Sequence, residues 1–343
     1  MQANGMLRYN TRQRFYGDVG VREGDTPSGG NDSDADDFLE GEGWDSWLEA
    51  EFRYVLPIGA GRGNAMHTFV TSDGLLVRGA THGQWNPFES GRTLLILKPF
   101  FQYRTIDVTA DNIGDIPSPN PPETGSTVKN ETNGLEFLVE YDNRDYAENA
   151  QQGSLTRLGI ARDFGWFQSS GAWTSVEGEF SKYFSFGDSS FFRQQVLALN
   201  AWTAYVPSTK AHLEDGFIVV DNAPPSNRGA TLGGLTRLRA YPTGRFNSNA
   251  AIYYSAELRG IPAWDPLKDW PIIRKFAWRW WQWVVFAELG RVAPEWRFDE
   301  LHQDMKWSAG IGLRAMIAGG VGRIGVATSN ETTQFVIMVG QPF

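Results

Sequence analysis

The sequence predicts an all-β fold, an antiparallel β-barrel that spans a membrane. The first observation behind this prediction is an alternation of apolar and polar residues over segments long enough to cross a bilayer. The second is the lack of any run of about 18 apolar residues, together with a mean hydropathy of −0.37, which excludes a helical membrane protein. The third is composition, because 22 Phe, 14 Trp, 11 Tyr and 38 Gly without any Cys are typical of an exported barrel.

The alternation is clearest in Trp47–Pro57, Gly134–Asp142, Ala251–Arg259 and Trp307–Ile317. In each segment apolar side chains mostly occupy every second position, so one face of the strand meets lipid and the other faces the lumen. The same pattern along the chain predicts twelve strands, which are 46–57, 64–80, 91–108, 131–143, 153–164, 172–186, 190–206, 250–260, 280–291, 307–317, 320–328 and 333–343.

The connections between these strands favour an even count. The long segments 109–130, 207–249 and 292–306 alternate with short links such as 318–319. An even number of strands places both chain ends on one side of the membrane, which we expect to be the periplasm, with the long loops on the other side. A signal peptide is taken to have been removed before residue 1.

Residues 1–45 are predicted to form a periplasmic extension, partly disordered because of its acidic and polar composition, before a barrel of residues 46–343. Two segments leave fourteen strands as an alternative count. Residues 64–80 contain Ser72-Asp73-Gly74, which also fits a hairpin turn. Residues 6–21 form a further candidate strand.

Nothing in the sequence predicts an enzyme, a catalytic residue, a metal site or a cofactor. The chain has four histidines without metal-ligand spacing, which are His67, His82, His212 and His302. A G-x-S-x-G nucleophile elbow is absent from the sequence. Carboxylates with calcium-ligand spacing do occur at Asp32, Asp34 and Asp36, but the later positions of an EF-hand loop are not matched. The net charge of −9 excludes nucleic acid as a partner.

Two carboxylates on predicted neighbouring strands, Glu257 and Glu288, lie on the face opposite the lipid-facing side chains. Two such carboxylates repel each other unless a cation lies between them. Arg239 is carried by the long loop 207–249, and its guanidinium can bond two carboxylates at once. We therefore expect the loop to fold into the lumen and Arg239 to bind both glutamates. The alternative is that all three side chains are solvated in a wet pore.

At this loop the sequence resembles a known family. Leu238-Arg239-Ala240-Tyr241 resembles the V-R-G-F/Y motif that BamA and TamA, barrels of the bacterial surface-antigen family, carry on their sixth loop, although Ala240 replaces the glycine. Further segments that resemble the family's motifs, in the family's order, are Tyr141–Asp145 before the loop, and Phe286–Val292, Ser308–Arg314 and the C-terminal Val339–Phe343 after it. The resemblance implies that Gly340 and Phe343 belong to a C-terminal sorting signal.

The resemblance implies a location in the outer membrane of a Gram-negative bacterium and a role in inserting or translocating proteins or lipids. The implied partners are outer-membrane lipids including lipopolysaccharide, the barrel-assembly machinery during biogenesis, and an unfolded client protein. The family's usual sixteen strands are a further alternative to twelve, and the first 45 residues are too few for a POTRA module.

Closure of the predicted barrel pairs its first strand, Trp47–Pro57, with its last, Thr333–Phe343. Pro342 has no N–H to donate there, so this seam is either frayed or simply capped at the membrane interface. Two other function classes stay open beside insertion or translocation. One is a passive narrow pore, and the other is a structural or anchoring barrel, including one that forms a homodimer.

Overall fold

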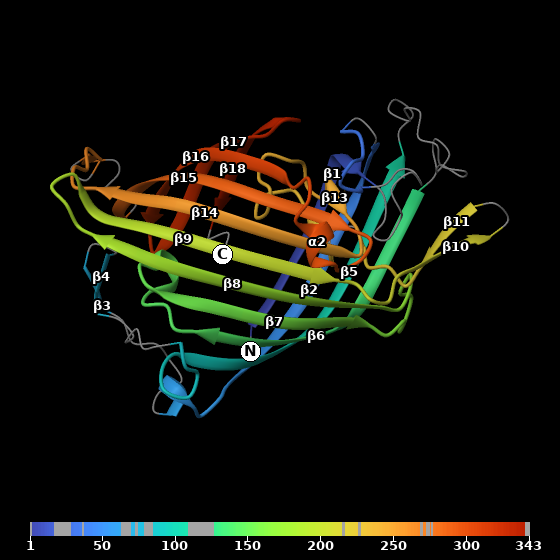
Figure 1. Ribbon diagram of the computed structural model, residues 1–343, viewed down its shortest axis with the longest axis horizontal. Helices are drawn as coiled ribbons and strands as arrows, with labels where there is room; N and C mark the ends of the chain where they lie inside the picture. Colours follow the sequence, from blue (N-terminus) through green and yellow to red (C-terminus); the bar gives the residue numbers. More distant parts are fainter. Residues whose placement is uncertain are drawn as a thin grey trace.

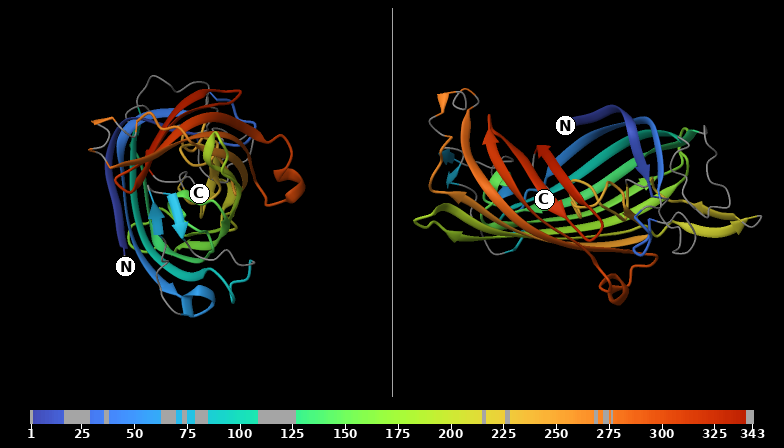
Figure 2. Two further views of the ribbon diagram at one scale, coloured as in Figure 1. Left: turned by 90° about the vertical axis from the view of Figure 1, so that its left-hand side faces the viewer. Right: turned by 90° about the horizontal axis from the view of Figure 1, so that it is seen from above.

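Twelve long strands form one antiparallel sheet that curls into a barrel in the computed structural model (Figures 1 and 2). The structure describes residues 2–16, 29–35, 38–62, 70–72, 75–78, 85–108, 127–214, 217–225, 228–267, 270–271, 275 and 277–339. In sheet order the strands are β1 (Gln2–Phe15), β2 (Leu39–Val55), β5 (Arg92–Val108), β6 (Thr127–Asp142), β7 (Gly153–Asp163), β8 (Trp173–Gly187), β9 (Phe192–Tyr205), β14 (Ala250–Pro262), β15 (Trp278–Ala293), β16 (Lys306–Ile317), β17 (Gly320–Thr328) and β18 (Thr333–Val339).

Short elements lie in the connections. They are the 3-10 helices η1 (Gly59–Arg62) and η3 (Ala147–Asn149), the helix α2 (Phe298–Leu301), and the hairpin strands β3 (Val70–Ser72), β4 (Leu75–Arg78), β10 (Lys210–Glu214), β11 (Phe217–Asp221), β12 (Thr231–Leu232) and β13 (Phe246–Asn247). Within the described part of the chain, no helix is long and apolar enough to cross a membrane.

The predicted number of twelve strands is confirmed, but one of the twelve assigned segments was wrong, and one wall strand lies where residues 6–21 were only a further candidate. The described residues of 64–80 supply no wall strand, because β3 and β4 pair only with each other as a hairpin. The twelfth strand is instead β1, which pairs with β2 from Gln2↔Glu51 to Phe15↔Leu39. The extension assigned to residues 1–45 thus contains one wall strand and the start of another.

Charge explains why the acidic residues before residue 46 join the wall. Arg12 of β1 lies 2.7 Å from Glu40 of β2, and Arg8 lies 3.1 Å from Asp45. Arg14 is a second, longer neighbour of Glu40 at 3.8 Å. Glu40 and Asp45, two of the carboxylates in this acidic stretch, are therefore matched by arginines on the adjacent strand.

Side chains alternate across the wall as the two-residue period requires. In β9, for example, Val196, Ala198 and Trp202 are buried towards the interior, whereas Leu199 between them is exposed. The exposed positions of the other strands are also largely apolar, as in Leu158, Ile160, Phe180, Leu258, Val285, Leu289, Ile311, Leu313, Ile324, Phe335 and Ile337. A continuous apolar outer face is what a transmembrane barrel presents to lipid.

The two ends of the barrel differ. We call the end that carries the connections β5–β6, β9–β14 and β15–β16 the loop end, and the opposite end, which carries the two-residue link 318–319, the turn end. The first residue of β1 and the last residue of β18 both lie at the turn end, because the strand count is even. β1 and β18 are the two edges of the sheet, and no pairing joins them in the described residues. The predicted seam strand Trp47–Pro57 is thus an inner neighbour of the true edge.

The connection from β9 to β14 fills part of the interior. The β10–β11 hairpin extends from the loop end (Figure 1), and the chain then turns back. Residues 228–249, which we call the inserted loop, pack inside the wall. Leu238, Ala240 and Tyr241 of this loop share one buried cluster with Trp202 of β9 and Phe286 of β15. The end-on view in Figure 2 shows the wall curling around this loop.

The β1–β2 register gives a direct test, because the chain has no native Cys. We expect Ala3→Cys with Ala50→Cys to form a disulfide on mild oxidation, since these residues are directly paired and paired Cα atoms fall within the range of about 4.4–6.8 Å that a disulfide needs. After a protease has cut the chain between β1 and β2, non-reducing electrophoresis shows whether the two fragments stay linked by the disulfide. Ala3→Cys with Glu49→Cys is the control and should stay unlinked, because its side chains point to opposite faces.

Candidate functional site in the barrel lumen

Two glutamates on neighbouring strands point into the same part of the lumen. Glu257 of β14 is paired in register with Phe286, and Glu288 of β15 is paired with Ser255, so the two glutamates lie one diagonal step apart on one face. Their exposed fractions are 0% and 1%. Two buried carboxylates at this spacing require positive charge close by.

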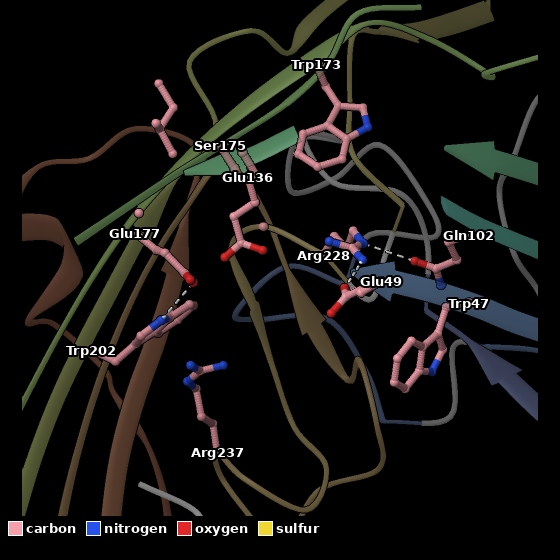
Figure 3. Close-up of a pocket in the computed structure, with 14 residues that line it drawn as sticks. Trp47, Glu49, Gln102, Glu136, Trp173, Ser175, Glu177, Trp202, Arg228 and Arg237 are labelled. Atoms are coloured by element: carbon pink, nitrogen blue, oxygen red, sulfur yellow. Dashed lines mark hydrogen bonds and ion pairs between the residues drawn. The ribbon is translucent and has the colours of Figure 1, made fainter. Parts of the chain in front are cut away.

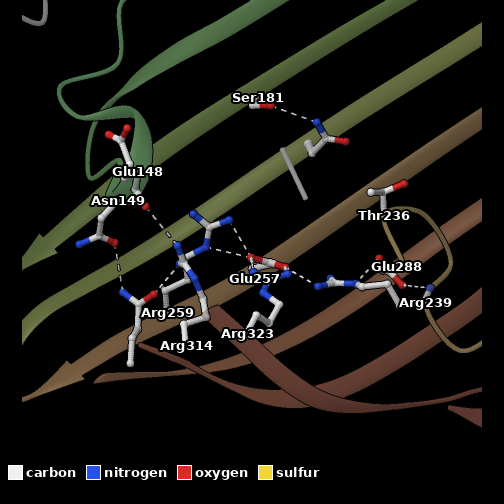
Figure 4. Close-up of polar contacts among 12 residues, drawn as sticks. Glu148, Asn149, Ser181, Thr236, Arg239, Glu257, Arg259, Glu288, Arg314 and Arg323 are labelled. Carbon is white, nitrogen blue, oxygen red and sulfur yellow. Dashed lines mark hydrogen bonds and ion pairs between the residues drawn. The ribbon is translucent and has the colours of Figure 1, made fainter. Parts of the chain in front are cut away.

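Arg239 of the inserted loop supplies that charge (Figure 4). Its Nη1 lies 2.8 Å from Oε1 of Glu257, and its Nε lies 2.8 Å from Oε1 of Glu288. The backbone N–H of Arg239 donates to Oε2 of Glu288 at 2.7 Å. Phe286 lies beneath the guanidinium, with 3.6 Å from Cζ to the ring centre. The structure thus brings together the three residues that the sequence analysis selected, on the inner side of the wall.

The backbone of the loop presents Arg239 through a tight turn. Leu238 has a φ of 50°, and the N–H of Tyr241 donates to the carbonyl of Leu238 at 2.9 Å. Leu238, Ala240 and Tyr241 are no more than 1% exposed, so the other motif residues pack around the arginine. Ala240 replaces the family's glycine without leaving the buried core, and its N–H donates to Oγ of Ser308 at 3.2 Å.

Three arginines that the sequence analysis did not select extend the site. Arg259 lies 2.7 Å from Oε2 of Glu257, and Arg323 lies 3.2 Å from the same oxygen. Arg314 donates to Oε1 of Gln282 at 2.5 Å and stays within the electrostatic reach of Glu257. These residues come from β14, β16 and β17, so the network ties four adjacent strands to the loop. We call Arg239, Glu257, Arg259, Glu288, Arg314 and Arg323 the ionic cluster.

The sequence did contain a signal for these arginines. Arg259 follows Glu257 by two residues. Arg314 and Arg323 occupy inward positions of two strands in which apolar and polar residues alternate. A single arginine on an inner wall, however, is equally compatible with solvation in a pore. Only the fold shows that Arg314 and Arg323 are cross-strand partners in register.

Further contacts fix the loop on both sides of Arg239. The hydroxyl of Tyr241 donates to Oδ1 of Asn330 at 2.9 Å. Arg245 binds Glu331 at 2.9 Å and the carbonyl of Ser33 at 2.7 Å. The loop is therefore attached both to the β17–β18 connection and to the segment between β1 and β2.

The arrangement performs electrostatic anchoring and offers no reactive group. Arginine stays protonated, and both glutamates are held by guanidinium donors. Across the described ranges, no group of His, Cys, Asp and Glu is arranged to hold a metal ion. The predicted sorting-signal residues Gly340 and Phe343 lie outside the described residues.

Comparison with known proteins matches residues 98–343 to the family model described as the Omp85 superfamily domain. Among solved structures, the chain is similar to BamA from Haemophilus ducreyi lacking POTRA domains 1-3, at 14% identity and a TM-score of 0.48. That match covers 88% of this chain and 55% of the BamA chain, so this chain spans little more than half of that one. A search of curated proteins found no match.

The ionic cluster predicts a large cost for losing its central cation. Arg239→Ala should lower the free energy of unfolding by about 3–5 kcal/mol, because it leaves two buried carboxylates short of a partner. Urea unfolding in lipid vesicles, followed by tryptophan fluorescence, measures this cost. Arg237→Ala is the matched control in the same loop, and it should cost about 0.5–2 kcal/mol, since Arg237 only stacks on Trp202 at 3.8 Å. Equal losses in the two variants would contradict the anchoring role.

Proposed function

Because the chain belongs to the Omp85 superfamily of outer-membrane barrels, we propose that it assists the insertion or translocation of proteins or lipids at the bacterial outer membrane. Barrels of this superfamily are non-enzymatic, which agrees with a site built for anchoring. The observation that carries the proposal is that β1 and β18 are edges without a pairing partner among the described residues, beside a lumen partly occupied by the inserted loop.

The filled lumen favours this role over a passive pore. A twelve-stranded barrel has a narrow interior, and here the inserted loop and the ionic cluster occupy part of it. A pore needs a continuous wet path, whereas Arg239, Glu257 and Glu288 are 2% exposed or less. An interior of this kind therefore fits a client that moves along the wall and its edges better than a solute that diffuses through the lumen.

The edges offer a chemical reason for contact with a client. An edge strand in lipid leaves backbone N–H and C=O groups without partners, which is costly, and an added strand removes that cost. A cavity of about 560 Å³ lies beside these edges, lined by Arg8 and Arg12 of β1, by Pro242–Gly244 of the inserted loop and by Gln334 of β18. The seam region is thus open to the lumen and polar on its inner side, as an entry point for an unfolded chain requires.

We place the turn end, with both chain ends, in the periplasm. The two-residue link 318–319 and the four-residue link 188–191 lie at this end, together with the longer β2–β5 and β14–β15 connections, and the β9–β14 connection, which is longer than either, lies at the other. Outer-membrane barrels have short periplasmic turns and longer outer loops. In this orientation the inserted loop enters the lumen from the outer side.

Conductance in planar bilayers distinguishes this proposal from a pore. We expect wild-type protein to stay closed and Arg239→Ala to show open events, because the variant loses the cation that fixes the loop to Glu257 and Glu288. Arg237→Ala should stay closed and serves as the control. Steady and equal conductance from all three proteins would favour the passive pore.

Client folding tests the role itself. Reconstituted wild-type protein should speed the folding of a urea-unfolded outer-membrane barrel into liposomes, because β1 and β18 offer edges for its strands. Gel migration of the folded client, which resists unfolding in detergent, gives the rate. A closed barrel without free edges, at the same protein-to-lipid ratio, is the control for general disturbance of the bilayer. Equal rates with both barrels would refute the proposal.

A further inference from the structure

A second cavity in the lumen has no residue in common with the ionic cluster. Its volume is about 330 Å³, and it lies between the wall and the inserted loop (Figure 3). The wall contributes residues from β2, β5, β6, β7, β8 and β9, and the loop contributes Arg228, Gly229 and Arg237. We call it the tryptophan cavity, because Trp47, Trp173 and Trp202 all line it.

The three tryptophans differ in how much of each indole ring is already in contact with other side chains. Trp202 carries the Arg237 guanidinium on its face at 3.8 Å. Trp173 stacks on Phe100, with ring centres 5.8 Å apart, and its Nε1 donates to Thr132. Trp47 lines the cavity from β2, with its indole beside Glu49 and Gln102 in Figure 3. An indole face on a cavity wall offers an apolar platform with a polar N–H at its rim.

The charges around the cavity are balanced. Glu49 binds Arg228 at 2.7 Å, and Glu136 binds Lys98 at 3.6 Å. The third carboxylate, Glu177, accepts a hydrogen bond from Nε1 of Trp202, the ring on which Arg237 is stacked. The three lining carboxylates thus lie close to the two lining arginines and to Lys98 outside the lining, and a ligand with a net charge of either sign would disturb this balance. The cavity therefore suits a neutral ligand.

One buried polar group in the cavity lacks a partner. Gln102 is 2% exposed, and its Oε1 accepts a hydrogen bond from Arg228 at 3.1 Å. Its Nε2 donates to no atom of the described residues. A buried donor without a partner lowers stability, and a ligand that accepts its hydrogen bond removes that cost. The amide of Gln102 is thus an unsatisfied donor buried in the cavity wall, and a turn of its side chain would present it to a ligand beside Glu49 and Glu136.

We propose that the tryptophan cavity binds a neutral, hydroxyl-rich ligand of the size of one sugar ring. A hydroxyl donates to a carboxylate and accepts from an amide, so it matches both kinds of group that line the cavity. A volume of about 330 Å³ lies at the lower end of the range for small-molecule sites. Trp47 packs against the C–H face of the ring, Gln102 Nε2 donates to a ring oxygen, and Glu136 and Ser175 bind hydroxyl groups.

The position of the cavity gives the ligand two kinds of contact. Trp173 and Ser175 begin β8, so the cavity lies in the half of the barrel nearest the loop end. Arg228 and Arg237 belong to the inserted loop, whereas Trp47 and Gln102 belong to the wall. A bound sugar therefore joins the loop to the wall at a place separate from Arg239. The inference does not rest on the proposed role in insertion.

Calorimetric titration of the full chain tests the proposal, in a zwitterionic detergent because sugar-headed detergents would compete. The probes are glucose and N-acetylglucosamine as neutral sugars, glucosamine as a cation and glucuronate as an anion. We expect a neutral sugar to bind saturably with a Kd of about 1 mM or tighter, and the charged sugars to bind about tenfold more weakly.

Variants then locate the site. Trp47→Ala and Gln102→Leu should each weaken the binding of the neutral sugar about tenfold or more. Trp44→Ala is the matched control on the same strand, because Trp44 faces outward and packs on Tyr9, and it should bind as the wild type does. Unchanged resistance to heat in gel migration shows that each variant is folded. The proposal is overturned if neither neutral sugar binds, if charged sugars bind equally well, or if folded Trp47→Ala and Gln102→Leu bind like the wild type.

Discussion

The contact of Arg239 with Glu257 and Glu288 is the constraint on which the interior depends. Without the arginine, the wall would present two buried carboxylates with an incomplete set of partners. Without the carboxylates, the loop would carry an unpaired guanidinium into a dry interior. Each part is acceptable only when the other is present, as for other buried polar networks. The inserted loop and the four strands β14, β15, β16 and β17 therefore act as one structural unit.

The N-terminal edge strand β1 makes weaker side-chain interactions with its neighbour β2. The arginines of β1 that bind Asp45 and Glu40 have exposed fractions of 55% and 66%, and exposed ion pairs contribute little to stability. The described part of β18, Thr333–Val339, is 7 residues long, whereas β2 has 17. The strands that carry the ionic cluster are thus locked by buried charge pairs, whereas β1 is joined to β2 by exposed ones. A barrel that must keep its shape while exposing an edge benefits from this division.

The sequence predicted most of the wall, because the two-residue period is strong wherever one face meets lipid. The prediction failed for β1, whose outward positions include Ala3 and Gly5, too small to signal a lipid-facing side. It also failed for 64–80, where two short apolar runs imitate a strand.

In the site, Arg239, Glu257 and Glu288 were identifiable from the motif and from the repulsion between two inward carboxylates. The contribution of Arg314 and Arg323 depends on cross-strand register, and that of Ser33 depends on a contact across 212 residues. A local pattern in the sequence carries neither kind of information.

The sequence distance between partners also sets an order for folding. Arg239 lies 18 residues from Glu257 and 49 from Glu288, and Arg323 lies 66 from Glu257. The contacts that bind the loop to the early part of the wall are far longer, at 179 residues for Arg228 with Glu49 and 212 for Arg245 with Ser33. Contacts between near neighbours in the chain form faster than distant ones. The C-terminal strands can therefore assemble around their loop first, and the N-terminal strands then close over a plug that is already in place.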